Sequence, residues 1–298
     1  MLSTWSSRTG PRWLGPVLVL VSAVLFSCSG VLTKAIEAGS WTILTWRGLV
    51  GGAGVAAYVV ARRRGRPTRE VFRLGPTGWF IAAVGAVGSV TFIVAFKHTH
   101  VANVSVIYAT IPFVAAVLER LVRGEPIRPR TVTAAGASFV GVILVVGAST
   151  GSPDLVGDVM ALAMVALNAI YMVLIRAFPN TDGVLAGAAG GPMLFAVGWI
   201  MTDPLAVSAR DAGLLVLFGV VFAAATVCWI AGTMRIPAAE SGLLGSAETP
   251  VAIALAWIVL SEAPPVASIA GALVVLVSLT AHSWPDLRSL RSDPTPAA

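Results

Sequence analysis

The side chain in this sequence that is most able to do chemistry is an acidic residue inside an apolar run. Glu248 lies about ten residues into the run 238–260, close to the centre of a membrane span. A charged side chain at that depth costs on the order of 2.5–3.5 kcal/mol or more, so the protein must shield it, pair it or protonate it. Glu248 could couple protons or bind a substrate amine, or it could bond a neighbouring helix. Ser241, Gly245 and Ala252 share its helix face, which suits a cavity wall or close helix packing.

The apolar run 101–122 carries the related positions of an internal repeat. Aligning its central proline with that of the Glu248 run places Thr110 at the position of Glu248 and Asn103 at the position of Ser241. Asn103 and Thr110 are seven residues apart and therefore share a helix face. Two such polar stripes facing each other would line a central cavity, which makes Asn103, Thr110 and Ser241 candidate substrate-binding residues.

Other polar side chains within or beside the apolar runs add candidates. Arg47 lies about six residues into the second run, where it could attract a substrate carboxylate, neutralise Glu248 or snorkel outward. Asn168 and Tyr171 lie three residues apart in the sixth run and could form part of a cavity wall, although aromatic residues in apolar helices commonly serve packing. Lys34, at the outer end of the first run, is typical of a snorkelling residue.

The sequence carries no catalytic constellation. It lacks a GxxxxGK nucleotide loop, and no His/Asp cluster or Ser/His pairing suggests a membrane enzyme. Cys28 and Cys228 lie inside apolar runs and favour packing roles. His98 and His100 lack further metal ligands or a visible charged partner, which favours loop histidines without a role. The prediction is a protein that is not an enzyme and binds no cofactor or metal.

Composition indicates the elements that must position these side chains. Of 298 residues, 57% are apolar and only 11% are charged, against roughly 25% charged residues in soluble proteins. The apolar runs are continuous and close to 20 residues long, which predicts membrane-spanning helices rather than strands. The predicted fold is an all-α integral membrane protein with ten transmembrane helices. These runs are about 14–34, 41–61, 77–97, 101–122, 131–149, 156–176, 184–202, 212–232, 238–260 and 266–283.

The basic residues test this count. With a cytoplasmic N-terminus, sixteen Lys or Arg residues fall in cytoplasmic segments, whereas only Lys34, Lys97 and Arg210 fall outside. This bias follows the positive-inside rule and predicts both termini in the cytoplasm. The net charge is +6, but the basic residues lie in short loops between apolar runs, which argues against nucleic-acid binding. We expect a multi-pass protein of the inner, or plasma, membrane.

The two halves of the chain repeat each other with an offset near 138–142 residues. The fourth and ninth runs each have a central proline and close on a glutamate, Glu125 or Glu262, expected to cap or brace the following loop. Because each half has five helices, the second half enters the membrane from the opposite side. The expected domains are a first repeat at 1–150, a second at 151–285 and a cytoplasmic tail at 286–298. Inverted repeats place the substrate path at their interface near the midplane.

These features together resemble the EamA-type group of the drug/metabolite transporter superfamily. The segment ETPVAIALAWIVLSE, from Glu248 to Glu262, is similar to the family's Glu-Thr-…-Trp-…-Leu-Gly-Glu ending, with Ser261 in place of the usual glycine. Arg47 in WRGLV stands where the family often has an arginine. The resemblance covers roughly residues 14–283. It implies a ten-helix carrier of amino acids or similar metabolites, often an exporter, with both termini cytoplasmic.

The sequence therefore predicts a secondary-active transporter that works by alternating access on a small-molecule substrate, with protons as a candidate coupling ion. Its two halves would move around a cavity lined by the first, fourth, sixth and ninth helices. The alternative is a non-transporting structural or partner subunit of a membrane complex. A midplane carboxylate in a repeat interface favours the carrier, because a scaffold has no need of one. Substrate, direction, coupling ion and oligomeric state stay open.

Overall fold

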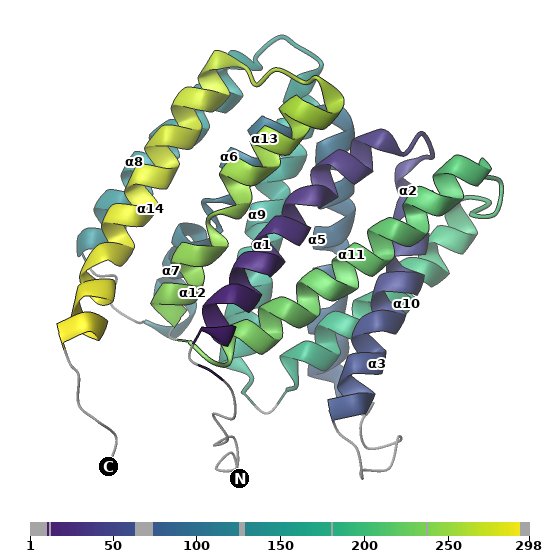
Figure 1. Cartoon of the computed structure of the whole chain (residues 1–298), viewed down its shortest axis with the longest axis horizontal. Helices are drawn as coiled ribbons and strands as arrows, with labels where there is room; N and C mark the ends of the chain where they lie inside the picture. Colours follow the sequence, from purple (N-terminus) through teal and green to yellow (C-terminus); the bar gives the residue numbers. More distant parts are fainter. Residues whose placement is uncertain are drawn as a thin grey trace.

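The computed structural model describes residues 11, 13–62, 74–124, 129–179, 181–236 and 238–292. The described part of the chain forms a bundle of ten helical segments, three of which are interrupted (Figure 1). In chain order the elements are α1 (Leu14–Ala35), α2 (Ser40–Trp46), η1 (Arg47–Gly51), α3 (Gly52–Arg62), α5 (Pro76–His98), α6 (Val101–Tyr108), α7 (Ile111–Arg123), α8 (Pro129–Ala148), α9 (Asp154–Ala177), α10 (Gly183–Met201), α11 (Ala209–Thr233), α12 (Ala238–Gly245), α13 (Glu248–Leu260) and α14 (Val266–Ser292).

The ten-helix prediction is confirmed, because each apolar run coincides with one helical segment. Among the described residues, nine segments are long and apolar enough to cross a membrane, and Val266–His282 adds a shorter apolar helix. α14 continues to Ser292, beyond the expected domain boundary at residue 285. Glu125 and the basic residues at 8, 12, 63–73 and 128 lie outside the described residues.

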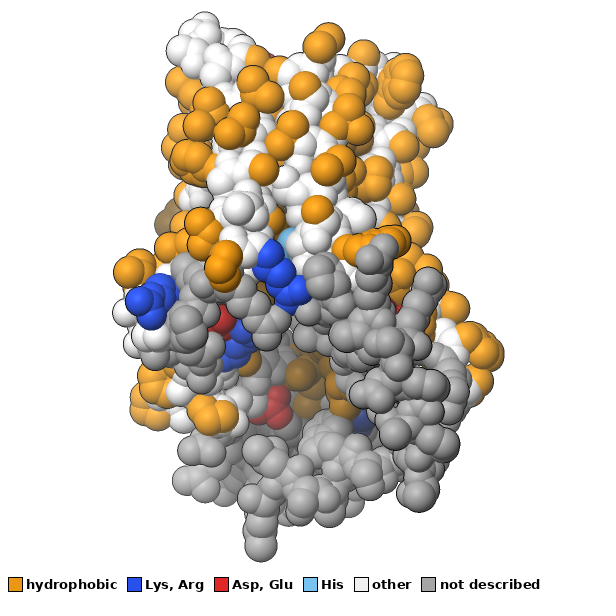
Figure 2. Space-filling view, turned by 90° about the vertical axis from the view of Figure 1, so that its left-hand side faces the viewer, with side chains coloured by type: hydrophobic (Ala, Val, Ile, Leu, Met, Phe, Trp, Pro, Cys, Tyr) orange, Lys and Arg blue, Asp and Glu red, His pale blue; other side chains and the backbone are white. Residues whose placement is uncertain are grey.

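The outer surface of the bundle suits lipid. Large apolar side chains such as Phe139, Ile143, Ile200 and Ile258 are exposed along several helices. On the face shown in Figure 2, hydrophobic side chains cover the upper part, whereas the described charged side chains appear only lower down. A soluble protein rarely exposes so continuous an apolar surface, so lipid is the solvent that this surface matches.

Helix packing follows the inverted repeat. The close pair α5 and α9 has its counterpart in α11 and α1, and α8 packs on its own counterpart α14. In Figure 1 the chain descends through α6 and α7 but rises through α12 and α13, so corresponding helices cross the bundle in opposite directions. α1 begins and α14 ends at the lower end of the bundle in this view. The upper end in Figure 1 is called the loop end below; it contains residues 36–39, 99–100, 149–153, 202–208 and 261–265.

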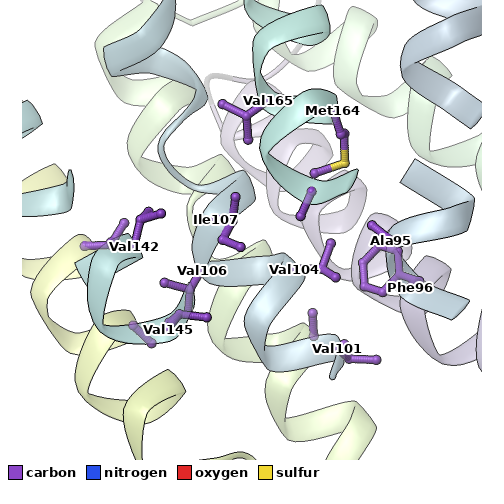
Figure 3. Packing of buried hydrophobic residues seen from close by; sticks show 14 of the residues in the cluster. Ala95, Phe96, Val101, Val104, Val106, Ile107, Val142, Val145, Met164 and Val165 are labelled. Atoms are coloured by element: carbon purple, nitrogen blue, oxygen red, sulfur yellow. The ribbon is translucent and has the colours of Figure 1, made fainter. Parts of the chain in front are cut away.

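The largest apolar core surrounds α6. Every residue from Val101 to Ile107 is buried, because α6 has neighbours on all sides. Figure 3 shows Val106 facing Val142 and Val145, while other α6 side chains face α5 and α9. These neighbours hold α6 in place, and α6 in turn lies beside the candidate site.

Breaks interrupt the fourth and ninth spans at corresponding places. α6 ends at Tyr108 and α7 begins at Ile111, while α12 ends at Gly245 and α13 begins at Glu248. Pro112 and Pro250 follow these breaks. Proline lacks an N–H and its ring clashes with the carbonyl four residues earlier, so each new helix has its proline within the first turn. Breaks of this kind leave backbone polar groups available at membrane depth.

Close contact between α8 and α14 depends on two glycines. A Cβ atom on Gly141 would lie 2.9 Å from the carbonyl oxygen of Gly271, and one on Gly271 would lie 2.8 Å from that of Gly141. Small residues at such positions let helix backbones approach closely in membranes.

We predict that Gly141→Ala separates α8 from α14 and destabilises the protein by about 1–3 kcal/mol, the usual cost of overpacking. Gly136→Ala is the matched control, because no atom lies within 4 Å of a Cβ placed on this residue of the same helix. The control should be neutral or stabilising by up to about 1 kcal/mol, because alanine favours helix. Thermal unfolding in detergent measures both changes, and equal melting temperatures would contradict this account of the contact.

Candidate functional site

A narrow cavity lies between α1, α5, α6 and α13, beside both helix breaks. It has room for about one water molecule. Aromatic, small and hydroxyl side chains form most of its wall, with one carboxylate. The lining residues are Phe26, Ser27, Gly30, Phe92, Phe96, Ser105, Tyr108, Glu248, Thr249 and Ala252.

Glu248 supplies the acidic group of this cavity. It is the first residue of α13, where the unpaired N–H groups of a helix N-terminus stabilise negative charge. Tyr108 lies close enough to interact with it electrostatically. Among the described residues, no Lys, Arg or His lies within 4.0 Å of its carboxylate. The carboxylate therefore faces the cavity without a protein counter-ion.

Hydrogen bonds fix the backbone around Glu248. The Ser27 hydroxyl of α1 donates to the Glu248 carbonyl at 2.9 Å, and the Thr249 hydroxyl donates to the Ser105 carbonyl at 3.4 Å. These bonds tie α13 to α1 and to α6 at the level of its break. The first half of the chain thus holds the second half at the site itself.

Arg47 is a buried basic residue that contacts an aromatic side chain of the cavity wall. It begins the π-helical turn η1, it is only 6% exposed, and its Nη2 donates to the Ser89 hydroxyl at 2.7 Å. Its guanidinium carbon lies 4.6, 5.4 and 5.8 Å from the ring centres of Phe222, Phe92 and Phe218. Cation–π contacts of this kind offset part of the cost of burying the charge.

The aromatic wall connects Arg47 to the cavity. Phe92 belongs to both, because it lines the cavity and contacts Arg47. Phe26 also lines the cavity, and its ring lies edge-to-face against Phe222, 6.1 Å between centres. Within the described residues Arg47 has no carboxylate partner, and Ser89 is its one hydrogen-bond partner. Arg47 and Glu248 are thus opposite charges that do not neutralise each other.

The structure places Asn103 away from this cavity, in a buried polar network. Its amide nitrogen donates to Thr99 at 3.1 Å, to Ser149 at 3.2 Å and to both carboxylate oxygens of Asp158 at 3.1 and 3.2 Å. Its amide oxygen accepts from Ser268. Because its donors and acceptor are used within the protein, Asn103 is held as a structural link rather than presented to a solute.

The remaining candidates also lie outside the cavity wall. Thr110 bonds the carbonyl of Ile107 at the break, and Ser241 is buried in α12. Asn168 donates to the Met164 carbonyl of its own helix, and Tyr171 donates to the carbonyl of Gly183. Of the candidates from sequence, the structure therefore brings Glu248 to the cavity and Arg47 to its aromatic wall.

Two expectations need correction. The third helix, through Phe92 and Phe96, lines the cavity in place of the sixth. Lys34 does not snorkel: its amine lies 2.6 Å from Glu262. Ser27 and Ser105 were missed, although a hydroxyl within each apolar run was a signal available in the sequence.

We predict that Asn103→Ala lowers stability by about 3 kcal/mol, because it removes one of the two side chains that donate to the buried Asp158 carboxylate. Asn168→Ala is the matched control and should cost less than about 1 kcal/mol, because Asn168 bonds only a carbonyl of its own helix. Thermal unfolding in detergent compares the two. Similar small effects would show that the network contributes little.

Comparison with known proteins agrees with this architecture. Residues 13–147 match the EamA-like transporter family. Over 266 residues the chain is 29% identical to Protein RarD of Streptomyces exfoliatus, covering 85% of this chain and 82% of that protein. A solved crystal structure shares the fold, with a TM-score of 0.64 and 18% identity over 92% of this chain and 98% of the other. The family match and the relative both agree with the EamA-type group of the drug/metabolite transporter superfamily that the sequence resembles.

Proposed function

We propose that this protein is a carrier of the EamA-type group, a secondary-active one that exports small organic solutes carrying an amine, such as amino acids or similar metabolites. The observation that carries the proposal is the Glu248 carboxylate, which lines the cavity and has no cationic partner among the described residues. A protonated amine or a proton complements such a group. Exchange of one for the other at Glu248 would couple solute movement to a proton gradient.

Alternating access follows from the size of the cavity and from the repeat. A site with room for about one water molecule must widen before it accepts an amino acid. The cavity wall combines α1, α5 and α6 of the first half with α13 of the second half. Movement of one half relative to the other would therefore widen the cavity and expose it to one side at a time. The proposed halves are residues 1–150 and 151–285.

Arg47 supports a zwitterionic solute. Its guanidinium has five N–H donors, of which one bonds Ser89, and a substrate carboxylate is a suitable acceptor for the others. Because Phe92 both lines the cavity and contacts Arg47, movement of its ring would bring a solute in the cavity toward the guanidinium. A solute with an ammonium group at Glu248 and a carboxylate at Arg47 would neutralise both buried charges.

The distribution of basic residues supports an orientation of the protein in the membrane. Lys34, Lys97 and Arg210 lie at the loop end, whereas Arg62, Arg176 and Arg235 lie at the opposite end. The positive-inside rule supports an inner-membrane protein with both termini and the second group in the cytoplasm, and with the loop end outside.

We predict that Glu248→Gln lowers counterflow in proteoliposomes at least tenfold, because an amide cannot exchange protons for amines. Purified protein is first screened for thermal stabilisation by the common amino acids, and those that stabilise it are tested as radiolabelled substrates. Glu37→Gln, at an 82% exposed side chain, is the control and should transport at the wild-type rate. Unchanged saturable counterflow in Glu248→Gln would reduce Glu248 to a structural role. A wild-type protein without saturable flux would instead favour a structural subunit.

We predict that Arg47→Gln discriminates between ligands with and without a carboxylate. Its affinity for leucine should fall about tenfold or more, whereas its affinity for 3-methylbutylamine, which lacks the carboxylate, should change by less than about twofold. Arg62→Gln, at the far end of the same span, is the control. Competition with a transported amino acid measures both affinities. Equal losses for both ligands would show that Arg47 acts only on helix packing.

A further inference from the structure

Tyr108 brings a hydroxyl group to the same cavity as the Glu248 carboxylate. It is the last residue of α6, directly before the break in the fourth span, whereas Glu248 begins α13 after the corresponding break in the ninth. Both side chains line the cavity, and they lie close enough to interact electrostatically. Tyr108 belongs to the first half of the chain and Glu248 to the second. The cavity thus receives one of these polar groups from each half.

The other hydroxyl groups of the cavity wall already donate their hydrogens to backbone carbonyls. Ser27 and Thr249 donate to carbonyls of neighbouring helices. Ser105 donates to the carbonyl of Val101, one turn earlier in α6, at 2.8 Å. These three hydroxyls therefore serve helix packing and keep only their lone pairs for a solute.

The hydroxyl of Tyr108 differs from these three. Within the described part of the chain it has no hydrogen-bond partner, and neither does the Glu248 carboxylate. A phenol can donate and accept a hydrogen bond, whereas an ionised carboxylate only accepts. Because the two groups lie near each other without a direct hydrogen bond, a small polar group between them can bond both.

The cavity limits the size of that group. It has room for about one water molecule, which an unsubstituted ammonium head, –NH₃⁺, matches in size. The rings of Phe92 and Phe96 line this space and contact each other edge-to-face, with centres 4.8 Å apart. A Cβ atom on Gly30 would lie 2.7 Å from the Phe96 ring, so α1 packs directly against that ring. These contacts leave the two rings little freedom to make space for methyl groups on a bound nitrogen.

A primary ammonium suits the polar groups as well as the space. It has three N–H donors, which the Glu248 carboxylate and the Tyr108 oxygen can accept. The aromatic rings of the wall add cation–π contacts, which depend on the charge and not on the number of N–H groups. Methylation of the nitrogen keeps the charge but removes these donors, so it affects the hydrogen bonds selectively.

We propose that Tyr108 and Glu248 form an ammonium site selective for primary amines, in which the Tyr108 hydroxyl determines selectivity against N-methylated amines. The proposal rests on the carrier function proposed above and narrows its substrate class. Glu248 supplies the negative charge, and Tyr108 distinguishes ammonium groups by the N–H groups that they retain. Because each half contributes one of the two side chains, a bound ammonium also links the halves at the site.

Tyr108→Phe tests the ammonium site, because it removes the hydroxyl and keeps the ring. The ligands are leucine and N,N-dimethylleucine, whose nitrogen keeps one N–H for Glu248 and none for Tyr108. Thermal stabilisation of the purified protein at increasing ligand concentration gives both apparent affinities without requiring transport. Tyr171→Phe is the matched control, because the Tyr171 hydroxyl bonds the Gly183 carbonyl outside the cavity wall.

The wild-type protein should bind leucine about tenfold or more tightly than N,N-dimethylleucine. Tyr108→Phe should weaken leucine binding about tenfold, the loss expected for one hydrogen bond to a charged group. Its affinity for N,N-dimethylleucine should change by less than about twofold, so the preference for the primary amine falls. Tyr171→Phe should leave both affinities at the wild-type values.

Equal losses for both ligands in Tyr108→Phe, or an unchanged affinity for leucine, would overturn the ammonium site. A wild-type protein without a preference for leucine, or without stabilisation by it, would do the same. The carrier proposal is judged separately, by saturable counterflow and by Glu248→Gln. Selective binding as predicted in a protein without counterflow would overturn the carrier and leave the ammonium site standing.

Discussion

A carboxylate without a counter-ion in the interior of an apolar bundle constrains the whole structure around it. Glu248 avoids lipid because α1, α5 and α6 pack around the start of α13. The break before α13 offers it the N-terminus of a helix, one of the few features of a membrane protein that stabilises negative charge without a cation. In a continuous ninth helix, the backbone N–H and carbonyl groups around this carboxylate would already be hydrogen-bonded to each other. The break therefore favours an acidic group at this position, although the corresponding break before α7 has none.

Other buried or partly buried charges have protein partners, and this contrast separates groups available for function from groups that hold the structure together. Asp158, Glu262 and Lys34 are bonded to protein groups and hold helices together. Arg47 and Glu248 are not paired with opposite charges among the described residues, although Arg47 is buried and Glu248 lines the cavity. Burying an ion without a partner costs free energy. Because this fold keeps an arginine and a glutamate near the same aromatic side chains, it favours a ligand that carries both a negative and a positive group.

Much of the fold follows from the sequence, because bilayer thickness sets the length of each apolar run. The ten predicted spans and the repeat therefore match the helices closely. The position of Glu248 in the cavity also followed from its depth in the run. The role of Asn103 could not be predicted in the same way, because it depends on Asp158 and Ser268, residues that are distant in sequence and brought together only by packing. The same reason explains why the third helix, not the sixth, completes the cavity, and why Lys34 pairs instead of snorkelling.

The central claim is that Glu248 is the group that a transported solute contacts in the cavity. Protection of Glu248 from a hydrophobic carbodiimide, followed by peptide mass spectrometry, tests this claim most directly, because such reagents modify carboxyl groups in apolar surroundings. The account predicts that the reagent modifies Glu248 and that a saturating transported amino acid slows this modification severalfold, while modification of Glu37 stays constant. Modification of Glu248 at the same rate with and without the solute would contradict it, because the solute would then bind elsewhere.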